Sequence, residues 1–174
     1  MNITKKRTVS GTGTIEENFL VDMFGQITEK LRQKYNYSDT EILGLWSDNA
    51  IFVPAAIFAG NLSPAESLAK FLKENNGLSY HEIAELIGRD ERSIWANYKR
   101  AAKKMPWPFG INNGISVPAS IFNSEKSILE SLVCYLKGSK KMRNSSIAKL
   151  LNKNTANIWT VHSRAKKKEN KNGQ

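Results

Sequence analysis

The feature of this sequence that most limits its fold is an internal repeat with a fixed offset of 64 residues. The segment IFVPAAIF at 51–58 recurs as ISVPASIF at 115–122, and the same offset aligns SLAKFLK with SLVCYLK without a gap. Roughly 21 of the 54 residue pairs from 51/115 to 104/168 are identical. Self-similarity at a fixed offset indicates one structural unit that is present twice. We call these segments the first copy and the second copy.

Each copy contains the same four parts in the same order. An extended V-P-A segment comes first, because Pro54 and Pro118 are tolerated only at the edge of a sheet. One helix follows, expected over 63–73 in the first copy and over 124–137 in the second, and two more helices complete the copy. The sequence therefore predicts an all-α fold with two tandem three-helix helix-turn-helix units, over 51–105 and 115–168.

The end of the first copy carries the pattern of a helix-turn-helix. Ser79 and Glu82 have the spacing of a capping box at the start of one helix, and Gly88 permits a tight turn after it. A basic helix follows and stops before Pro106. In the second copy the turn residue is Asn152, which also tolerates the left-handed conformation. Both copies thus fit the motif.

These residues resemble the helix-turn-helix in region four of sigma-70 family factors, the part that reads the upstream promoter element. The matching positions carry Glu82, Ile83, Ala84, Gly88, Ile94, Arg100, Ala101 and Lys104. Three leucine positions of the family pattern instead carry Ile87, Tyr98 and Met105. The resemblance implies a DNA-binding domain in which Glu91, Arg92 and Trp95 contact bases, and it implies docking on RNA polymerase.

The charge of the chain is unevenly distributed. The net charge is +10, from 26 Lys and Arg against 16 Asp and Glu. From residue 137 to the end, about eleven basic residues stand against one acidic residue, and the chain before that point is roughly neutral. Such an asymmetry favours an anionic partner for the second copy, with a solubilising tail as the alternative.

Base readout in a helix-turn-helix depends on the exposed face of the second helix. The residues expected on that face are Glu91, Arg92, Trp95, Ala96 and Lys99 in the first copy, and Thr155, Asn157, Trp159 and Thr160 in the second. Arg92 could pair with guanine and Asn157 with adenine. We therefore expect the first copy to specify sequence and the second to anchor. The two tryptophans have another interpretation, which the repeat favours: packing against the V-P-A segment of their own copy.

Other polar and basic residues of the two motifs are expected to bind DNA phosphates. They are Ser79, Arg89, Arg100, Lys103, Lys104, Arg143, Lys153, Arg164, Lys166, Lys167 and Lys168. The second motif lacks the acidic residues of the first. It should therefore contribute more of the salt-dependent affinity.

The structure expected for the rest of the chain can be stated segment by segment. They are a flexible basic arm over 1–14, an N-terminal helical segment over 15–50, a linker over 106–114 and a disordered tail over 169–174. Within the helical segment we expect helices over 15–35 and 38–46. This segment could pack on the rest of the chain or form a homodimer.

Several classes of function are not expected. The sequence has no nucleophile–base pair, phosphate loop or metal-ligand spacing, so we expect neither an enzyme nor a cofactor or metal. His81 and His162 occupy different positions in the repeat, and Cys134 reads as a small buried hydrophobe. Membrane spans and signal peptides are also not expected, which indicates a cytoplasmic, nucleoid-associated protein.

The sequence thus favours a sequence-specific regulator of transcription that binds double-stranded DNA. Its two recognition helices would enter successive major grooves, roughly 34 Å apart. A symmetric arrangement of the copies predicts a palindromic site and a tandem arrangement predicts a direct repeat, and the sequence does not choose between them. The alternatives are a sigma-like adaptor that contacts RNA polymerase and a sequence-tolerant architectural protein of chromatin.

Overall fold

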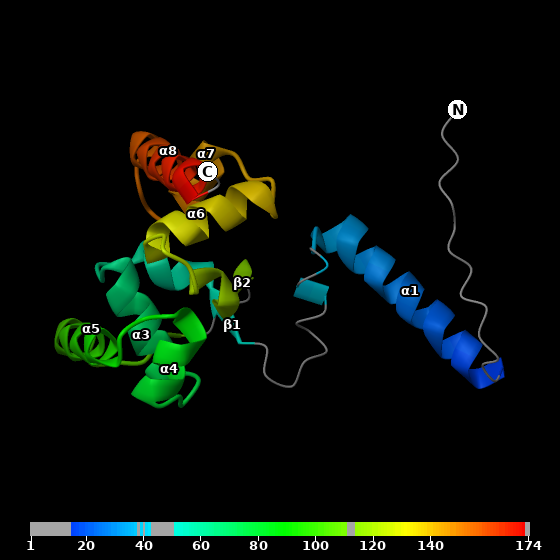
Figure 1. Ribbon diagram of the computed structural model, residues 1–174, viewed down its shortest axis with the longest axis horizontal. Coiled ribbons are helices and arrows are strands. Elements are labelled where there is room, and N and C mark those ends of the chain that lie inside the picture. Colours follow the sequence, from blue (N-terminus) through cyan, green and yellow to red (C-terminus); the bar gives the residue numbers. More distant parts are fainter. Residues whose placement is uncertain (1–14, 38, 40, 43–50, 111–113, 173–174) are drawn as a thin grey trace. The chain divides into compact units, whose positions relative to one another are not determined.

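The described part of the chain is mostly helical, with one two-stranded sheet (Figure 1). The computed structural model describes residues 15–37, 39, 41–42, 51–110 and 114–172. The chain divides into two compact units, residues 1–38 and residues 39–174. Among the described helices, none is long and apolar enough to cross a membrane.

The described part of the first compact unit is a single helix, α1 (Ile15–Tyr35), where the sequence predicted one. Its apolar side chains are largely exposed: Phe19, Leu20, Val21, Met23, Phe24 and Ile27. The basic arm expected over 1–14 lies outside the described residues, and so does most of the helix expected over 38–46.

The second compact unit holds both copies of the repeat. The first copy contains β1 (Phe52–Pro54), the 3-10 helix η1 (Ala55–Ala59), α3 (Pro64–Glu74), α4 (Tyr80–Ile87) and α5 (Glu91–Lys104). The second contains β2 (Ser116–Pro118), the 3-10 helix η2 (Ala119–Phe122), α6 (Ile128–Gly138), α7 (Asn144–Leu150) and α8 (Thr155–Asn172). The element order is therefore the same in both copies, as the repeat predicted.

The two V-P-A segments pair with each other. Strands β1 and β2 are antiparallel, with Val53 opposite Val117 at the centre of the ladder. Two further backbone bonds extend it, from Ala55 N–H to the carbonyl of Ile115 and from Ala119 N–H to that of Ile51, each 2.8 Å. Each copy thus supplies the strand that the other copy needs.

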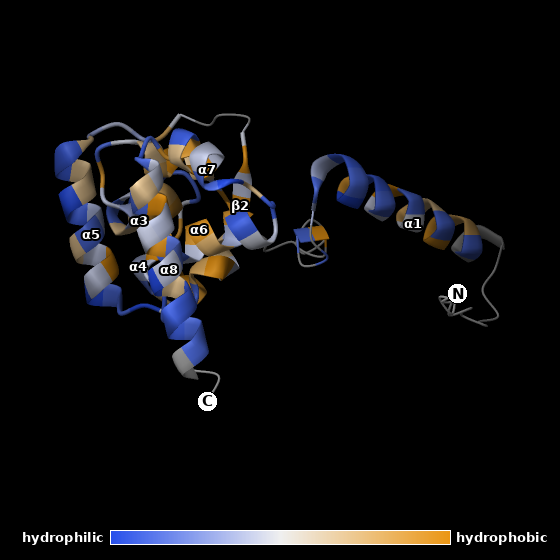
Figure 2. Cartoon of the chain, turned by 90° about the horizontal axis from the view of Figure 1, so that it is seen from above, coloured by the Kyte–Doolittle hydropathy of each residue, from blue (hydrophilic) through white to orange (hydrophobic). Residues whose placement is uncertain are grey.

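The two copies share one hydrophobic core. The Phe58 and Phe122 rings meet with their centroids 5.8 Å apart, and both side chains are buried. Helix α4 of the first copy packs against η2 of the second, and α7 packs against η1. The core cluster therefore runs without a break through both copies, and the most hydrophilic segments, such as the end of α8, lie outside it (Figure 2).

Serine capping boxes set the start of three helices. Ser63 with Glu66 begins α3, Ser79 with Glu82 begins α4, and the same pair of bonds begins α6. In α6 the cap is Ser127, so the expected start at residue 124 is wrong by about one turn. The reason is that the capping box fixes the first turn at the serine that has a glutamate three residues later.

The two turns agree with the prediction from the sequence, whereas the C-terminal tail does not. Gly88 and Asn152 both have positive φ, 59° and 50°, as expected for the two equivalent turns. The tail predicted to be disordered over 169–174 is helical as far as Asn172, which is the end of α8. Lys126 holds this extension through an ion pair with Glu169, at 2.6 Å. Residues 173–174 lie outside the described part.

Candidate nucleic-acid interface

Helices α5 and α8 are the two candidate reading helices, and both are held by their apolar faces. Asp90 caps the start of α5, where its carboxylate accepts from Ser93 N–H at 3.0 Å. Asn154 occupies the equivalent position before α8 and accepts from Asn157 N–H at 3.1 Å. Because a few apolar side chains of each helix point into the core, the opposite face is left to solvent. The buried side chains are Ile94, Ala101, Ile158, Val161 and Ala165.

The residues expected to read bases lie on these solvent faces. In α5, Glu91, Arg92, Trp95 and Lys99 are exposed and Ala96 is half-buried. In α8, Thr155, Asn157 and Trp159 are exposed, while Thr160 is half-buried and donates its hydroxyl to the Ala156 carbonyl at 2.9 Å. Each set therefore forms an accessible surface on one helix.

The two tryptophans are at the surface. Trp95 is 50% exposed and Trp159 is 63% exposed. This exposure does not support the interpretation that they pack in the core against the V-P-A segments, and their contact with DNA stays a prediction. The ammonium group of Lys99 lies 5.8 Å from the centre of the Trp95 ring, in range of a cation–π contact.

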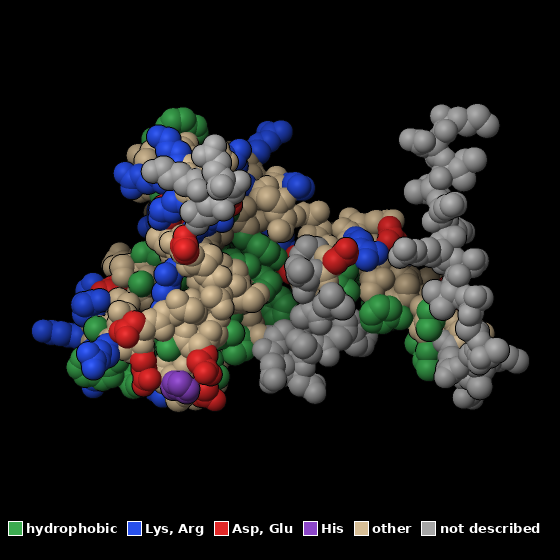
Figure 3. Space-filling view, in the orientation of Figure 1, with side chains coloured by type: hydrophobic (Ala, Val, Ile, Leu, Met, Phe, Trp, Pro, Cys, Tyr) green, Lys and Arg blue, Asp and Glu red, His purple; other side chains and the backbone are tan. Residues whose placement is uncertain are grey.

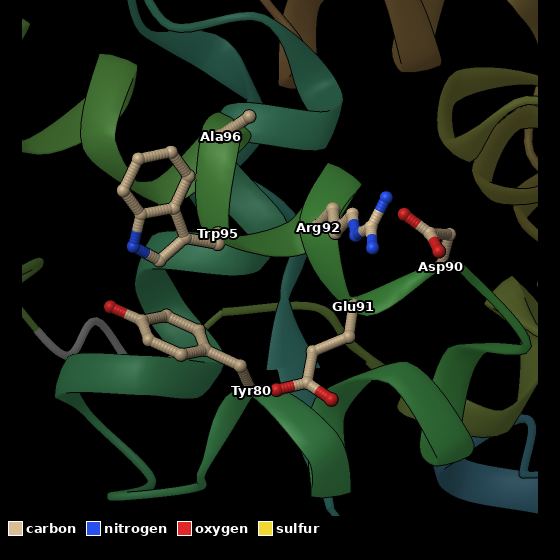
Figure 4. A pocket seen from close by; sticks show the side chains of 6 residues that line it. All are labelled: Tyr80, Asp90, Glu91, Arg92, Trp95 and Ala96. Atoms are coloured by element: carbon tan, nitrogen blue, oxygen red, sulfur yellow. The ribbon is translucent and has the colours of Figure 1, made fainter.

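The start of α5 borders an open pocket of about 720 Å³. Trp95 and Tyr80 line one side of this pocket, and Arg92, Glu91 and Asp90 line another (Figure 4). Tyr80 comes from α4 and did not emerge from the sequence as a site residue. Its ring contacts that of Tyr98 and lies under the Lys73 ammonium group, with centroid distances of 5.8 and 4.9 Å. The candidate reading face of α5 thus borders a pocket with aromatic walls.

Most residues expected to bind phosphates are accessible. Exposed members of the set are Ser79, Lys103, Arg143, Arg164, Lys166 and Lys167, and Lys153 is half-buried. In Figure 3, Lys and Arg side chains gather over α8 and along the outer side of α5. These side chains can contribute to an electrostatic footprint for a polyanion.

Two of the expected phosphate ligands have another role. Lys104 donates to both carboxylate oxygens of Glu66, at 2.8 and 2.9 Å, and Lys168 donates to Glu130 at 2.7 Å. The two pairs are equivalent at the offset of 64 residues, and both glutamates are buried. Each pair ties the end of α5 or α8 to the capped start of α3 or α6. Both lysines thus anchor their helices, while their side chains remain about half exposed and their binding of phosphates stays a prediction.

Burial and pairing act in opposite directions on these carboxylates. Burial raises the pKa of Glu66, but the Lys104 ammonium group and the Ser63 N–H lower it by more, so the pKa is below its ordinary value. Glu130 shows the same net lowering of its pKa, with burial opposed by Lys168 and Ser127. Both groups are thus carboxylates in the folded chain at neutral pH.

Arginine side chains of the first copy are also partly engaged. Arg89 donates to the backbone carbonyls of Ser124 and Lys126, at the start of α6 in the other copy. Arg89 thus joins the two copies through one guanidinium nitrogen, and its binding of phosphates stays a prediction. Arg100 donates to Asn97 at 2.7 Å but remains exposed.

The first copy also carries an acidic surface next to the candidate reading helix α5. His81 lies 3.5 Å from the Glu85 carboxylate and 3.7 Å from that of Glu91, and all three side chains are exposed. Figure 3 shows the histidine among acidic side chains over α4. An acidic surface of this kind weakens the attraction of the first copy to phosphates, which agrees with the charge difference seen in the sequence.

The single cysteine is separate from this interface. Cys134 is half-buried in α6, and burial raises the pKa of its thiol. It occupies the position that Lys70 has in the first copy, where a fully buried ammonium group is paired with Glu74 at 2.6 Å. Within the described residues, no group of three or more His, Cys, Asp or Glu side chains could hold a metal ion.

The sequence did not predict the roles of Glu66 and Glu130, which hold the candidate reading helices, or of Tyr80, which lines the pocket beside α5. The two glutamates had a signal, because opposite charges recur at the same offset in Glu66–Lys104 and Glu130–Lys168. Tyr80 had no such signal, since the equivalent residue in the second copy is Asn144.

Comparison with family models, curated proteins and solved structures gives no match to this chain.

Proposed function

We propose that this protein is a sequence-specific regulator of transcription that binds double-stranded DNA with two helix-turn-helix units. The reading helices would be α5 and α8, each placed in a major groove. The observation that carries this proposal is the pair of equivalent helices that hold polar, aromatic and basic side chains on their solvent faces. A solvated helix needs no exposed tryptophan, yet both helices have one at the same position.

The two helices would have different tasks. On α5, Arg92 and Glu91 are able to pair with guanine and with the cytosine amino group. On α8, Thr155 and Asn157 offer smaller contacts, while Arg164 and Lys166 supply charge near the phosphates. Sequence discrimination would therefore come mainly from α5, and salt-dependent affinity mainly from α8.

Selection from a random duplex library tests this proposal. The purified chain is incubated with the library at two salt concentrations, and bound duplexes are sequenced. Arg92→Ala should reduce the base preference in one part of the enriched motif. Arg164→Ala should weaken binding to all sequences and make the affinity less dependent on salt concentration. Salt-sensitive binding without an enriched motif would instead support a sequence-tolerant architectural protein.

The acidic surface of the first copy favours a second candidate function. This surface exposes His81, Glu85 and Glu91. Its acidic groups would repel DNA, so the surface suits a basic protein partner. In that case the chain would be an adaptor that holds DNA through the second copy and contacts RNA polymerase through the first. Loss of polymerase binding in Glu85→Lys, with DNA selection unchanged, would support this function.

A further inference from the structure

The two copies are related by a two-fold axis, and the strand register shows it. Val53 pairs with Val117, which is its own equivalent at the offset of 64 residues. The flanking pairs are Phe52 with Pro118 and Pro54 with Ser116, and each of these is converted into the other by exchanging the copies. A pairing that maps onto itself in this way requires a two-fold axis through the central valine pair.

Contacts away from the strands obey the same symmetry. Phe58 and Phe122 are equivalent residues that touch each other, which a two-fold axis allows. The packing of α4 on η2 is matched by that of α7 on η1. In a head-to-tail arrangement each contact would join two different surfaces, so equivalent residues would not meet. The second compact unit is therefore an internal dimer within one chain.

From this symmetry we infer that the DNA target is an inverted repeat whose two half-sites differ. The inference rests on the proposed function and specifies the substrate of the same site. Duplex DNA has local two-fold axes perpendicular to its length, and a protein with two-fold symmetry reads half-sites in opposite directions. Helices α5 and α8 exchange under the protein axis, so they read opposite strands.

The half-sites differ because the reading faces break the symmetry. Glu91 and Arg92 of α5 correspond to Thr155 and Ala156 of α8, and Lys99 corresponds to Ser163. One half-site is thus read by charged side chains and the other by small polar or apolar ones. The wild-type target should look like an imperfect palindrome in which one half is more strongly defined.

A variant with two identical reading faces tests the inference directly. It carries five substitutions in α8: Thr155→Glu, Ala156→Arg, Asn157→Ser, Thr160→Ala and Ser163→Lys, each giving the residue at the equivalent place in α5. All five side chains are exposed or half-buried, so the core is unchanged. Library selection with this variant should enrich a symmetric palindrome made of two α5 half-sites. Two identical half-sites in the same direction would overturn the inference and leave the proposed function intact.

The reverse variant is the matched control, which separates a change of the reading face from an effect of five substitutions on folding. It gives α5 the residues of α8: Glu91→Thr, Arg92→Ala, Ser93→Asn, Ala96→Thr and Lys99→Ser. This variant should enrich a different and weaker palindrome. Circular dichroism checks that both variants are folded. If the unaltered chain enriches no motif at all, the proposed function fails, and the inference fails with it.

A second measurement uses only the wild-type chain. In one duplex the selected site is kept, and in another the half-site of α5 is reversed in place. Reversal should weaken binding by at least about tenfold, because several base contacts are lost together. Equal affinity for the two duplexes would contradict the two-fold arrangement.

Discussion

Adjacent lysines at the end of α5 have different surroundings. Lys104 is paired with Glu66, whose side chain is 4% exposed, whereas Lys103 faces solvent. Removing Lys104 takes away the nearer of two cations beside a buried carboxylate, because Arg100 Nε also lies 3.5 Å from Glu66. Arg100 and solvent near Lys104 therefore offset part of the effect. We expect Lys104→Met to lower the free energy of unfolding by about 1–2 kcal/mol. Urea denaturation at neutral pH measures the change.

Lys103→Met is the matched control for this prediction. A surface substitution of this kind should change the free energy of unfolding by no more than about 0.5 kcal/mol. Under the proposed function it should, however, weaken binding to duplex DNA at low salt. Equal destabilisation by the two variants would mean that the Glu66 ion pair does not hold α5.

The lowered pKa of Glu66 predicts a pH dependence of stability. Because the folded chain binds this proton more weakly than the unfolded chain, the pair stabilises the fold fully above the ordinary pKa of 4.5. That contribution is lost as the pH falls through the lower pKa of the folded state. The variant Glu66→Gln should therefore lose less stability than wild type between about pH 7 and about pH 3.

Urea unfolding at the two pH values measures this difference, with Glu85→Gln as a control. Glu85 is exposed, so its replacement should leave the pH dependence close to that of wild type. An unchanged pH slope in Glu66→Gln would show that the carboxylate is not stabilised in the folded chain.

At the scale of elements, the starts of α3, α4 and α6 each depend on a single serine. Ser127 accepts from Glu130 N–H and begins α6, so Ser127→Ala should lower the free energy of unfolding by about 1 kcal/mol. Ser145→Ala inside α7 is the control and should be neutral or slightly stabilising, because alanine has the higher helix propensity. Thermal unfolding compares the two, and an equal melting temperature for both would argue against the capping box.

The sequence predicted helices correctly where the residues that determine them are close together in the chain. The capping pair Ser79–Glu82, the turn at Gly88 and the apolar spacing of Ile83, Ile87 and Ile94 predicted α4 and α5, and the structure confirms these helices. The end of α8 was missed because residue 169 onward lacks apolar periodicity. There Glu169 forms an ion pair with Lys126, a residue distant in the chain that no local pattern contains.

The candidate site was predictable only in part, for a related reason. Exposure of Arg92 and Asn157 follows from helical spacing alone. The roles of Lys104 and Arg89 depend on partners 38 and 35 residues or more away, which no local pattern contains. The pairing of the two V-P-A segments likewise depends on residues far apart in the chain, and the local pattern fits equally well a segment that packs on its own copy.

At the scale of the molecule, both copies should unfold together because they share one core. Leu132 of the second copy is fully buried, and Leu132→Ala should cost about 2–5 kcal/mol. We expect hydrogen exchange to accelerate in α3, α4 and α5 as well as in the second copy. The exposed Lys149→Ala in α7 is the control and should change neither copy. Acceleration confined to α6–α8 would show that the copies are independent.

Under the proposed function, one chain presents two reading helices to one duplex. The most direct test is an NMR titration of the ¹⁵N-labelled protein with a selected duplex. Amide signals of 91–99 in α5 and of 155–163 in α8 should shift together, and the shifts should reach completion at one duplex per chain. Changes confined to one helix, or centred on β1 and β2, would contradict this prediction.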